Sequence, residues 1–109
     1  KSIDCLHINF PDPWSKKAKR KHRILSTEFL TKIHPYFCSG GEFRFKTDHL
    51  EYFKSVTQIL MQLDFYSIDQ HTEDLHKSAY NNENILTEFE MLFKSKGNPP
   101  IGYLRAKEL

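Results

Sequence analysis

The sequence has 109 residues and a mass of 13.0 kDa, which allows one domain. Hydrophobic residues make up 39% and charged residues 28% of the chain, a balance typical of a soluble globular domain. No apolar run is long enough to span a bilayer, and no secretory signal is recognisable at the amino terminus. Two cysteines, Cys5 and Cys38, exclude a disulfide framework and a zinc site with four cysteine ligands.

The formal net charge of +2 hides a strongly basic segment. Six of the 16 basic residues lie within eight consecutive positions without an acidic residue among them: Lys16, Lys17, Lys19, Arg20, Lys21 and Arg23. The remaining 10 basic residues face 14 acidic ones, which leaves the rest of the chain with a formal charge of −4. Such a patch on an acidic body predicts a docking surface for a polyanion. A charged segment that is merely solvated is the alternative.

The first predicted element is a strand over residues 2–10. Its nearly continuous apolar side chains are typical of a strand buried on both faces, as in a parallel sheet. Pro11 and Pro13 end it, because neither a strand nor a helix continues through this pair.

A helix and a second strand follow the basic segment. Ser26 or Thr27 can cap the helix, and Pro35 and the pair Gly40-Gly41 end it. Its predicted inner face consists of Phe29, Leu30, Ile33 and Phe37. Alternating apolar residues over 42–47 predict the second strand.

The rest of the chain continues the alternation of helices and strands. We predict a helix over 50–63, a strand over 65–69, a long polar loop over 70–84, a helix from 87 to 97 and a last strand over 101–106. The order β-α-β-α-β-α-β predicts an α/β fold with a mainly parallel sheet and helices on both faces.

Three polar clusters occupy positions where such a fold binds ligands. Residues 9–14 follow the first strand, Lys46-Thr47-Asp48 ends the second, and residues 87–90 begin the helix before the last strand. Ligands of open α/β sheets bind beyond the carboxyl ends of the strands, so we expect these clusters to share one edge of the sheet.

Each cluster also has a purely structural interpretation. Asp12 between two prolines suits a turn, Asp48 suits a helix cap, Thr87 with Glu90 has the form of a capping box, and Trp14 suits packing. The six histidines lack metal-ligand spacing, so no metal site is predicted. No serine or cysteine has a recognisable base partner for acyl transfer.

The same clusters match the motifs of a known family. Residues 8–17, with the basic residues that follow, resemble the F-x-D-P-W-x-K-K-R-H-x-K-R-R segment of the tRNA (guanine-N7)-methyltransferases. Lys46-Thr47-Asp48 resembles the family's K-T-D, which there also follows a glycine pair, and residues 87–97 resemble its T-E-[YF]-E-x-x-F-x-x-K-G. Three motifs in the right order over nearly the whole chain are far more specific than any one of them.

The resemblance implies a Rossmann-like class I methyltransferase domain that uses S-adenosylmethionine and methylates N7 of a guanine in the variable loop of tRNA. Asp12 matches the catalytic carboxylate, which also lies beside the cofactor. The positions that match substrate contacts are Lys16, Asp48, Thr87, Glu88, Phe89 and Glu90. The positions that match the RNA-contacting segment are Ala18, Lys19, Arg20, Lys21, His22 and Arg23. As a further hypothesis, Trp14 stacks on the target base.

The sequence departs from the family pattern in two ways. Ala18, Lys19 and His22 replace an arginine, a histidine and an arginine, and residues 97–103 are less compact than the family's G-x-P-I-Y-R. The family's glycine-rich cofactor loop is also absent. The resemblance therefore assigns residues 1–109 to the carboxyl-terminal half of one domain, from its fourth strand onward. The chain alone is then expected neither to bind S-adenosylmethionine well nor to methylate.

Several alternatives stay open at this point. A non-catalytic RNA-binding module would use the basic segment alone, and an amino-group methyltransferase of nucleic acids would use Asp12-Pro13-Trp14 as a variant of N/D-P-P-Y/W. Neither alternative explains all three clusters. The resemblance implies a cytoplasmic enzyme with tRNA as partner and no metal. Whether it acts as a monomer, as a homodimer or with a helper subunit is not decided by the sequence.

Overall fold

The computed structural model describes residues 2–14, 16–83, 90 and 100–109. The strands are β1 (Ile3–Asn9), β2 (Phe37–Thr47), β3 (Tyr66–Thr72) and β4 (Gly102–Glu108), and the α-helices are α1 (Thr27–Ile33) and α2 (Leu50–Gln62). Short 3₁₀ helices are η1 (Lys17–His22), η2 (His34–Tyr36), η3 (Leu75–Lys77) and η4 (Ala79–Glu83). Except for Glu90, the helix predicted over 87–97 lies outside the described residues. None of the described helices is long and apolar enough to cross a membrane.

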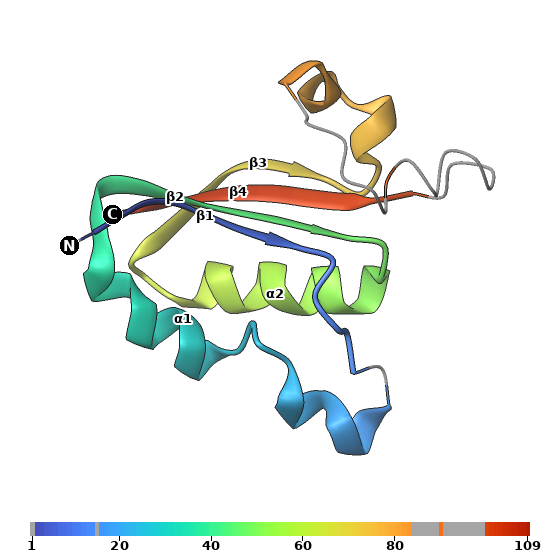
Figure 1. Cartoon of the computed structure of the whole chain (residues 1–109), viewed down its shortest axis with the longest axis horizontal. Helices are drawn as coiled ribbons and strands as arrows, with labels where there is room; N and C mark the ends of the chain where they lie inside the picture. The colour runs from blue at the N-terminus through green and yellow to red at the C-terminus, as the bar shows by residue number, and fades with distance from the viewer. Residues whose placement is uncertain (1, 15, 84–89, 91–99) are drawn as a thin grey trace.

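The four strands form one mixed sheet in the order β1-β2-β4-β3. β1 pairs with β2 in parallel, whereas β4 lies between β2 and β3 and runs antiparallel to both. β1, β2 and β3 therefore point the same way, as predicted, but only one of the three pairings is parallel (Figure 1). This arrangement brings the carboxyl ends of β1, β2 and β3 to one edge of the sheet, where β4 begins.

β2 is longer than predicted, because the glycine pair lies inside it. The strand starts at Phe37, which was predicted to belong to the preceding helix, and Gly40 takes a left-handed φ of 73°. The pairing of β1 with β2 is irregular just after Ile3. A Cβ at Gly41 would lie 2.8 Å from the Phe37 ring and 3.0 Å from the Ile3 carbonyl oxygen. The prediction that Gly40-Gly41 stops a helix is therefore wrong: the pair lets β2 bend closely past β1.

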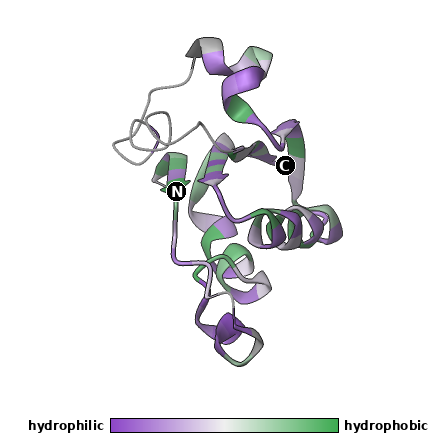
Figure 2. Cartoon of the chain, turned by 90° about the vertical axis from the view of Figure 1, so that its right-hand side faces the viewer, coloured by the Kyte–Doolittle hydropathy of each residue, from purple (hydrophilic) through white to green (hydrophobic). Residues whose placement is uncertain are grey.

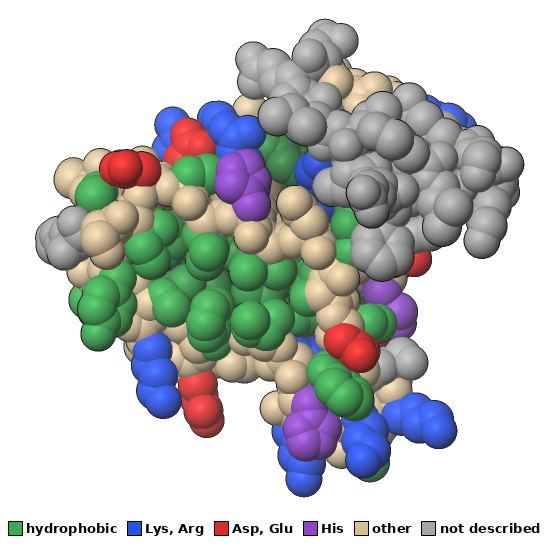
Figure 3. Space-filling view, in the orientation of Figure 1, with side chains coloured by type: hydrophobic (Ala, Val, Ile, Leu, Met, Phe, Trp, Pro, Cys, Tyr) green, Lys and Arg blue, Asp and Glu red, His purple; other side chains and the backbone are tan. Residues whose placement is uncertain are grey.

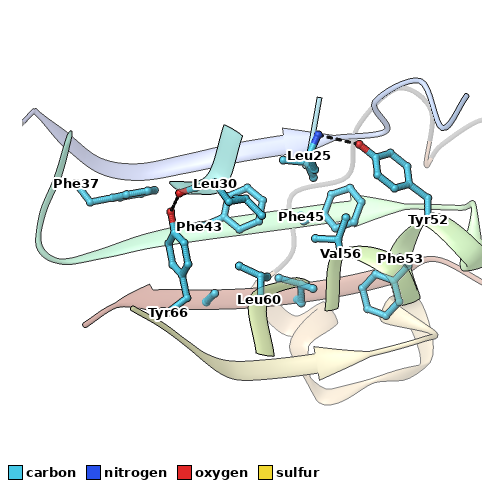
Figure 4. Close-up of a cluster of buried hydrophobic side chains, with 12 residues drawn as sticks. Leu25, Leu30, Phe37, Phe43, Phe45, Tyr52, Phe53, Val56, Leu60 and Tyr66 are labelled. Carbon is cyan, nitrogen blue, oxygen red and sulfur yellow. Dashed lines mark hydrogen bonds between the residues drawn. The ribbon is translucent and has the colours of Figure 1, made fainter. Parts of the chain in front are cut away.

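Both described α-helices cover one face of the sheet and enclose the main core (Figures 1 and 4). Ser26 caps α1, as predicted, because its hydroxyl accepts a hydrogen bond from the Phe29 N–H at 3.2 Å. The core residues are Leu25, Leu30, Phe37, Phe43, Phe45, Tyr52, Phe53, Val56, Leu60, Tyr66, Leu104 and Ala106. Their burial supplies the main driving force that holds the helices on the sheet.

Two tyrosine hydroxyls tie the backbone near α1 to the rest of the core (Figure 4). The Tyr52 hydroxyl accepts a hydrogen bond from the Leu25 N–H at 3.1 Å, and the Tyr66 hydroxyl donates one to the Leu30 carbonyl at 2.7 Å. Both bonds are buried and join a side chain to a backbone group. The segment before α1 is thereby fixed to α2.

η3 and η4 lie across the sheet from α2 (Figure 1), and their side chains take part in a smaller apolar cluster. Its buried members are Leu75, Ile101 and Tyr103, with Phe10 and Tyr80 packed against them. The Leu75 N–H donates a hydrogen bond of 2.8 Å to the Ile101 carbonyl. The predicted polar loop over 70–84 therefore contains the end of β3 and two 3₁₀ helices, and Leu75 and Tyr80 anchor it beside the start of β4.

β1 is an edge strand of this sheet and is less buried than predicted. Asp4, Cys5, His7 and Asn9 are exposed, while Leu6 and Ile8 are half-buried against the main core. The prediction of burial on both faces is therefore wrong for β1. The apolar run suggested two buried faces, but only one face of β1 packs on the helices, and the other carries the exposed side chains.

Candidate functional site

The edge at which β1, β2 and β3 end gathers most of the polar residues singled out in the sequence. Figure 2 faces this edge, with α2 seen end-on and the hydrophilic η1 segment projecting below it. Asp12 follows β1 and Asp48 follows β2. The Phe10 N–H donates a hydrogen bond of 2.8 Å to the Lys46 carbonyl, so the two neighbouring strand ends are joined. The expected meeting of the first two clusters at one edge is confirmed.

The loop after β1 holds Asp12 in a compact turn. An Asp12 carboxylate oxygen accepts a hydrogen bond from the Trp14 N–H at 2.9 Å, the pattern of an Asx turn. Phe10 and Trp14 both have left-handed φ values, 52° and 43°, which are unfavourable for residues other than glycine. Asp12 itself is exposed. The turn thus presents a carboxylate to solvent from a constrained backbone.

Arg23 closes this turn from the side of the basic segment. Its Nε donates a hydrogen bond of 2.5 Å to the Pro13 carbonyl, and its two terminal nitrogens donate to the two carboxylate oxygens of Glu51 at 2.5 and 3.1 Å. The guanidinium carbon lies 4.5 Å from the centre of the Tyr52 ring. The hydrogen bonds from Arg23 lower the pKa of Glu51, and the Arg23 side chain is only 7% exposed. Arg23 therefore faces the protein, whereas Arg20, which lies 3.5 Å from the same Glu51 carboxylate, keeps a side chain that is 45% exposed.

The other described positions that match RNA contacts face solvent. Ala18, Lys19, Arg20, Lys21 and His22 are all exposed, as is Lys16 just before them. Figure 3 shows Lys and Arg side chains gathered at the lower right, where Figure 1 places η1. Trp14 is 38% exposed, and its ring centre lies 5.2 Å from that of His22. A positive surface with an aromatic pair at its border thus adjoins the Asp12 turn.

Asp48 is exposed and does not cap α2, which corrects one structural interpretation of this residue. The cap is the His49 ring, whose Nδ1 accepts a hydrogen bond from the Tyr52 N–H at 3.1 Å. The Thr47 hydroxyl in turn accepts a bond from the His49 N–H at 3.1 Å. The Asp48 carboxylate is therefore not committed to the helix.

A cavity of about 370 Å³ opens beside Asp48. It is lined by Thr47, Asp48, Leu50, Glu73, Asp74, Pro100 and Gly102. Glu73 and Asp74 were missed in the sequence, because the third strand was predicted to end at residue 69 whereas β3 continues to Thr72. The signal that could have found them is a carboxylate pair directly after a strand. Carboxylates in this position accept hydrogen bonds from N–H donors.

No group of three His, Cys, Asp or Glu side chains in the described part of the chain is arranged to hold a metal ion. The carboxylates of Asp48, Glu73 and Asp74 give the cavity hydrogen-bond acceptors and negative charge.

Glu90 lies deep inside the protein between two nitrogen groups. Its carboxylate oxygens lie 2.7 Å from Lys46 Nζ and 2.8 Å from His76 Nε2. The side chain of Glu90 is fully buried, and those of His76 and Lys46 are 3% and 10% exposed. The cluster joins the end of β2 to η3 and to the 87–90 motif, of which Thr87, Glu88 and Phe89 lie outside the described residues. A buried carboxylate is stable only with such partners.

Removing this carboxylate should destabilise the protein. We expect Glu90→Ala to lower the free energy of unfolding by about 3 kcal/mol, because a buried carboxylate that contacts Lys46 and His76 is lost. Urea unfolding followed by circular dichroism measures the change. Glu73→Ala, at an exposed carboxylate, is the matched control and should change stability by less than about 0.5 kcal/mol. Equal stability of the two variants would show that the buried cluster contributes nothing.

Comparison with known proteins finds methyltransferases. The family described as "Putative methyltransferase" matches residues 1–102. A "tRNA (guanine-N(7)-)-methyltransferase" of Clostridium perfringens is 38% identical over 107 residues, which are 98% of this chain and 48% of that protein. One of Lachnoclostridium phytofermentans is 39% identical over 98 residues, 89% of this chain and 45% of that protein. A "Bifunctional glycosyltransferase/methyltransferase" of Fusobacterium nucleatum is 38% identical over 107 residues, 98% of this chain and 16% of that protein.

The chain spans about half the length of the two tRNA (guanine-N(7)-)-methyltransferases named here. The four-stranded mixed sheet with its helices is consistent with part of a Rossmann-like methyltransferase fold. The family match covers nearly all of the sequence and confirms the resemblance carried by the three motifs. The chain therefore belongs to the putative methyltransferase family.

Proposed function

We propose that this chain forms the substrate-facing part of a tRNA (guanine-N7)-methyltransferase, which transfers a methyl group from S-adenosylmethionine to N7 of a guanine in the variable loop. The observation that carries the proposal is the meeting, at one edge of the sheet, of the exposed carboxylates Asp12 and Asp48 with the exposed basic segment. The names of the relatives support the choice of tRNA and of N7.

The residue of this chain that suits the cofactor is Asp12. S-adenosylmethionine carries a sulfonium cation and, when bound, supplies the methyl group. The exposed Asp12 carboxylate, oriented by the Trp14 N–H at 2.9 Å, has the charge and the position for a group bound at the end of β1. The sequence contains no glycine-rich loop, so the remaining cofactor contacts are not assigned to this chain. We accordingly propose that the 109 residues alone do not support methyl transfer.

The chemistry requires positioning rather than proton abstraction. Guanine N7 has a lone pair that points outward in the base plane, so no general base is needed. As N7 is methylated, positive charge develops on the purine, and the Asp12 carboxylate stabilises this charge more in the transition state than in the ground state. Holding N7 in line with the methyl carbon contributes further to the rate.

Asp48 is proposed to orient the guanine. Its carboxylate is exposed and free of any capping role, and it can accept hydrogen bonds from the guanine N1–H and exocyclic amine. That contact leaves N7 on the side of the base that faces away from Asp48. Glu73 and Asp74 line the same cavity and reinforce its preference for an edge rich in N–H donors over a phosphate.

The basic segment and Trp14 are proposed to hold the tRNA around the target base. Lys16, Lys19, Arg20 and Lys21 are exposed and can bind phosphates without reading sequence. A guanine inside a folded tRNA has to leave its stack to reach the cavity, and the half-exposed Trp14 ring offers a surface on which it can stack.

The direct test is methyl transfer from labelled S-adenosylmethionine to unmodified tRNA, followed by nucleoside analysis. In the intact protein, Asp12→Asn should lower kcat by about 100-fold or more while it leaves tRNA affinity nearly unchanged, because a charge that acts in the transition state is lost. Asp64→Asn, at an exposed carboxylate before β3, is the control and should retain full activity. Full activity of Asp12→Asn would refute its role. Binding of tRNA without any 7-methylguanosine would favour the RNA-binding module instead.

The phosphate contacts can be tested separately by the salt dependence of tRNA binding. Replacing Lys19 and Lys21 together by Gln should weaken binding and reduce the slope of log K against log[salt] by about 2, roughly one unit for each lost phosphate contact. Lys32→Gln removes an exposed charge from α1, away from η1, and should leave the slope unchanged. An unchanged slope in the double variant would contradict a phosphate-binding role for η1.

A further inference from the structure

Arg23 differs from the other cations of the basic segment in where its guanidinium points. We propose that Arg23 is a positioning residue that fastens the Asp12–Trp14 turn to the start of α2, and that it is not a phosphate ligand. The inference rests on the proposed function, since it assigns the residue's task within that site. It also differs from the resemblance to the tRNA (guanine-N7)-methyltransferases, which places Arg23 among the RNA-contacting residues.

The hydrogen bonds of Arg23 already use all three of its side-chain nitrogens. Nε donates to the Pro13 carbonyl and the terminal nitrogens bind Glu51 in a bidentate pair. The Tyr52 ring covers one face of the guanidinium at 4.5 Å. A phosphate would have to displace a paired carboxylate from a side chain that is 7% exposed. Such an exchange would break the charge-assisted hydrogen bonds between Arg23 and Glu51, which are stronger than hydrogen bonds between neutral groups.

The partner of Arg23 is itself held in a favourable place. Glu51 lies in the first turn of α2, where the helix dipole favours a carboxylate. Next to it along the helix, the Tyr52 hydroxyl accepts a hydrogen bond from the Leu25 N–H, two residues after Arg23. The backbone on the carboxyl side of Arg23 is thus tied to the same helix turn. The guanidinium connects this rigid point to the loop after β1.

The loop that Arg23 holds contains Asp12 and Trp14, two of the residues proposed to act on the guanine. Pro13 stands between Asp12 and Trp14, and its carbonyl is the atom that Arg23 binds. Trp14 has a left-handed φ of 43°, a conformation that persists when the surroundings impose it. The bond from Arg23, together with the Trp14 N–H bond to Asp12, supplies this constraint. Without Arg23 the Asp12 carboxylate and the Trp14 ring would lose their fixed position.

A lysine at this position could not reproduce the arrangement. An ammonium is a point charge, whereas the planar guanidinium bridges the Glu51 carboxylate and the Pro13 carbonyl at once. A phosphate ligand, in contrast, would tolerate lysine. The behaviour of Arg23→Lys therefore separates the two roles.

The first readout is the fluorescence of Trp14, the only tryptophan of the sequence. In the 109-residue chain, we expect Arg23→Lys and Glu51→Gln each to raise the acrylamide quenching constant of Trp14 by about 2-fold, because the turn is released. Lys19→Gln should leave it unchanged. Far-UV circular dichroism verifies that each variant is folded. Quenching that is unchanged in both Arg23→Lys and Glu51→Gln would overturn the proposal.

The second readout is tRNA binding by the intact protein, which does not depend on activity. Arg23→Gln should leave the salt slope of binding unchanged, whereas a phosphate ligand would lower it by about 1. A lowered slope therefore overturns the proposal. In methyl transfer, Arg23→Gln and Glu51→Gln should each lower kcat. The double variant should lower kcat by less than the product of the two single effects, because both substitutions remove the Arg23–Glu51 pair. Wild-type protein that does not bind tRNA would refute the proposed function, while the Trp14 quenching would still test the Arg23 contact.

Discussion

The ion pair between Arg23 and Glu51 connects the parts of the candidate site that come from different regions of the chain. The two residues are 28 positions apart in the sequence, and the segment between them includes α1 and the whole of β2. Through this pair, the turn after β1 and the exposed η1 segment are both held against the first turn of α2. His49, the N-cap of that turn, directly follows Asp48. A single buried guanidinium thus sets the spacing between a carboxylate proposed to act on the base and the cations proposed to bind phosphates.

The mixed sheet gives the edge its chemical character. Because β4 runs antiparallel between β2 and β3, the latter two both end at this edge, and Asp48 comes to line one cavity with Glu73 and Asp74. The start of β4 packs tightly there, since a Cβ at Gly102 would lie 2.6 Å from the Phe53 ring. Negative charge in the cavity and positive charge on η1 are thereby separated. This separation suits a nucleotide, because the N–H groups of its base bind carboxylates while its phosphates bind cations.

The local elements could largely be predicted from the sequence, but their long-range contacts could not. The Ser26 cap and the apolar face of α2 follow from patterns within one turn of helix, and the structure confirms them. The place of Gly41 could not be predicted, because the atoms that leave no room for a Cβ there belong to Phe37 and Cys38 of β2 and to Ile3 of β1, which approach only once the strands are bent and paired. Arg23 was predicted to contact RNA like its basic neighbours, because the sequence does not show that the fold places Glu51 against its guanidinium. His76 gave no signal either, since its partner Glu90 is 14 residues away.

The central claim is that the target guanine binds at the sheet edge shared by Asp12 and Asp48 while η1 holds the neighbouring phosphates. It can be tested most directly by photocrosslinking. Unmodified tRNA with 4-thiouridine beside the variable-loop guanine would be crosslinked to the intact protein, and the attached peptides identified by mass spectrometry. The account predicts crosslinks to residues 12–22, above all at Trp14 and His22, whose rings lie 5.2 Å apart. Crosslinks confined to the groove between α2 and β3, around Thr57 and His71, would place the RNA on another face and contradict the account.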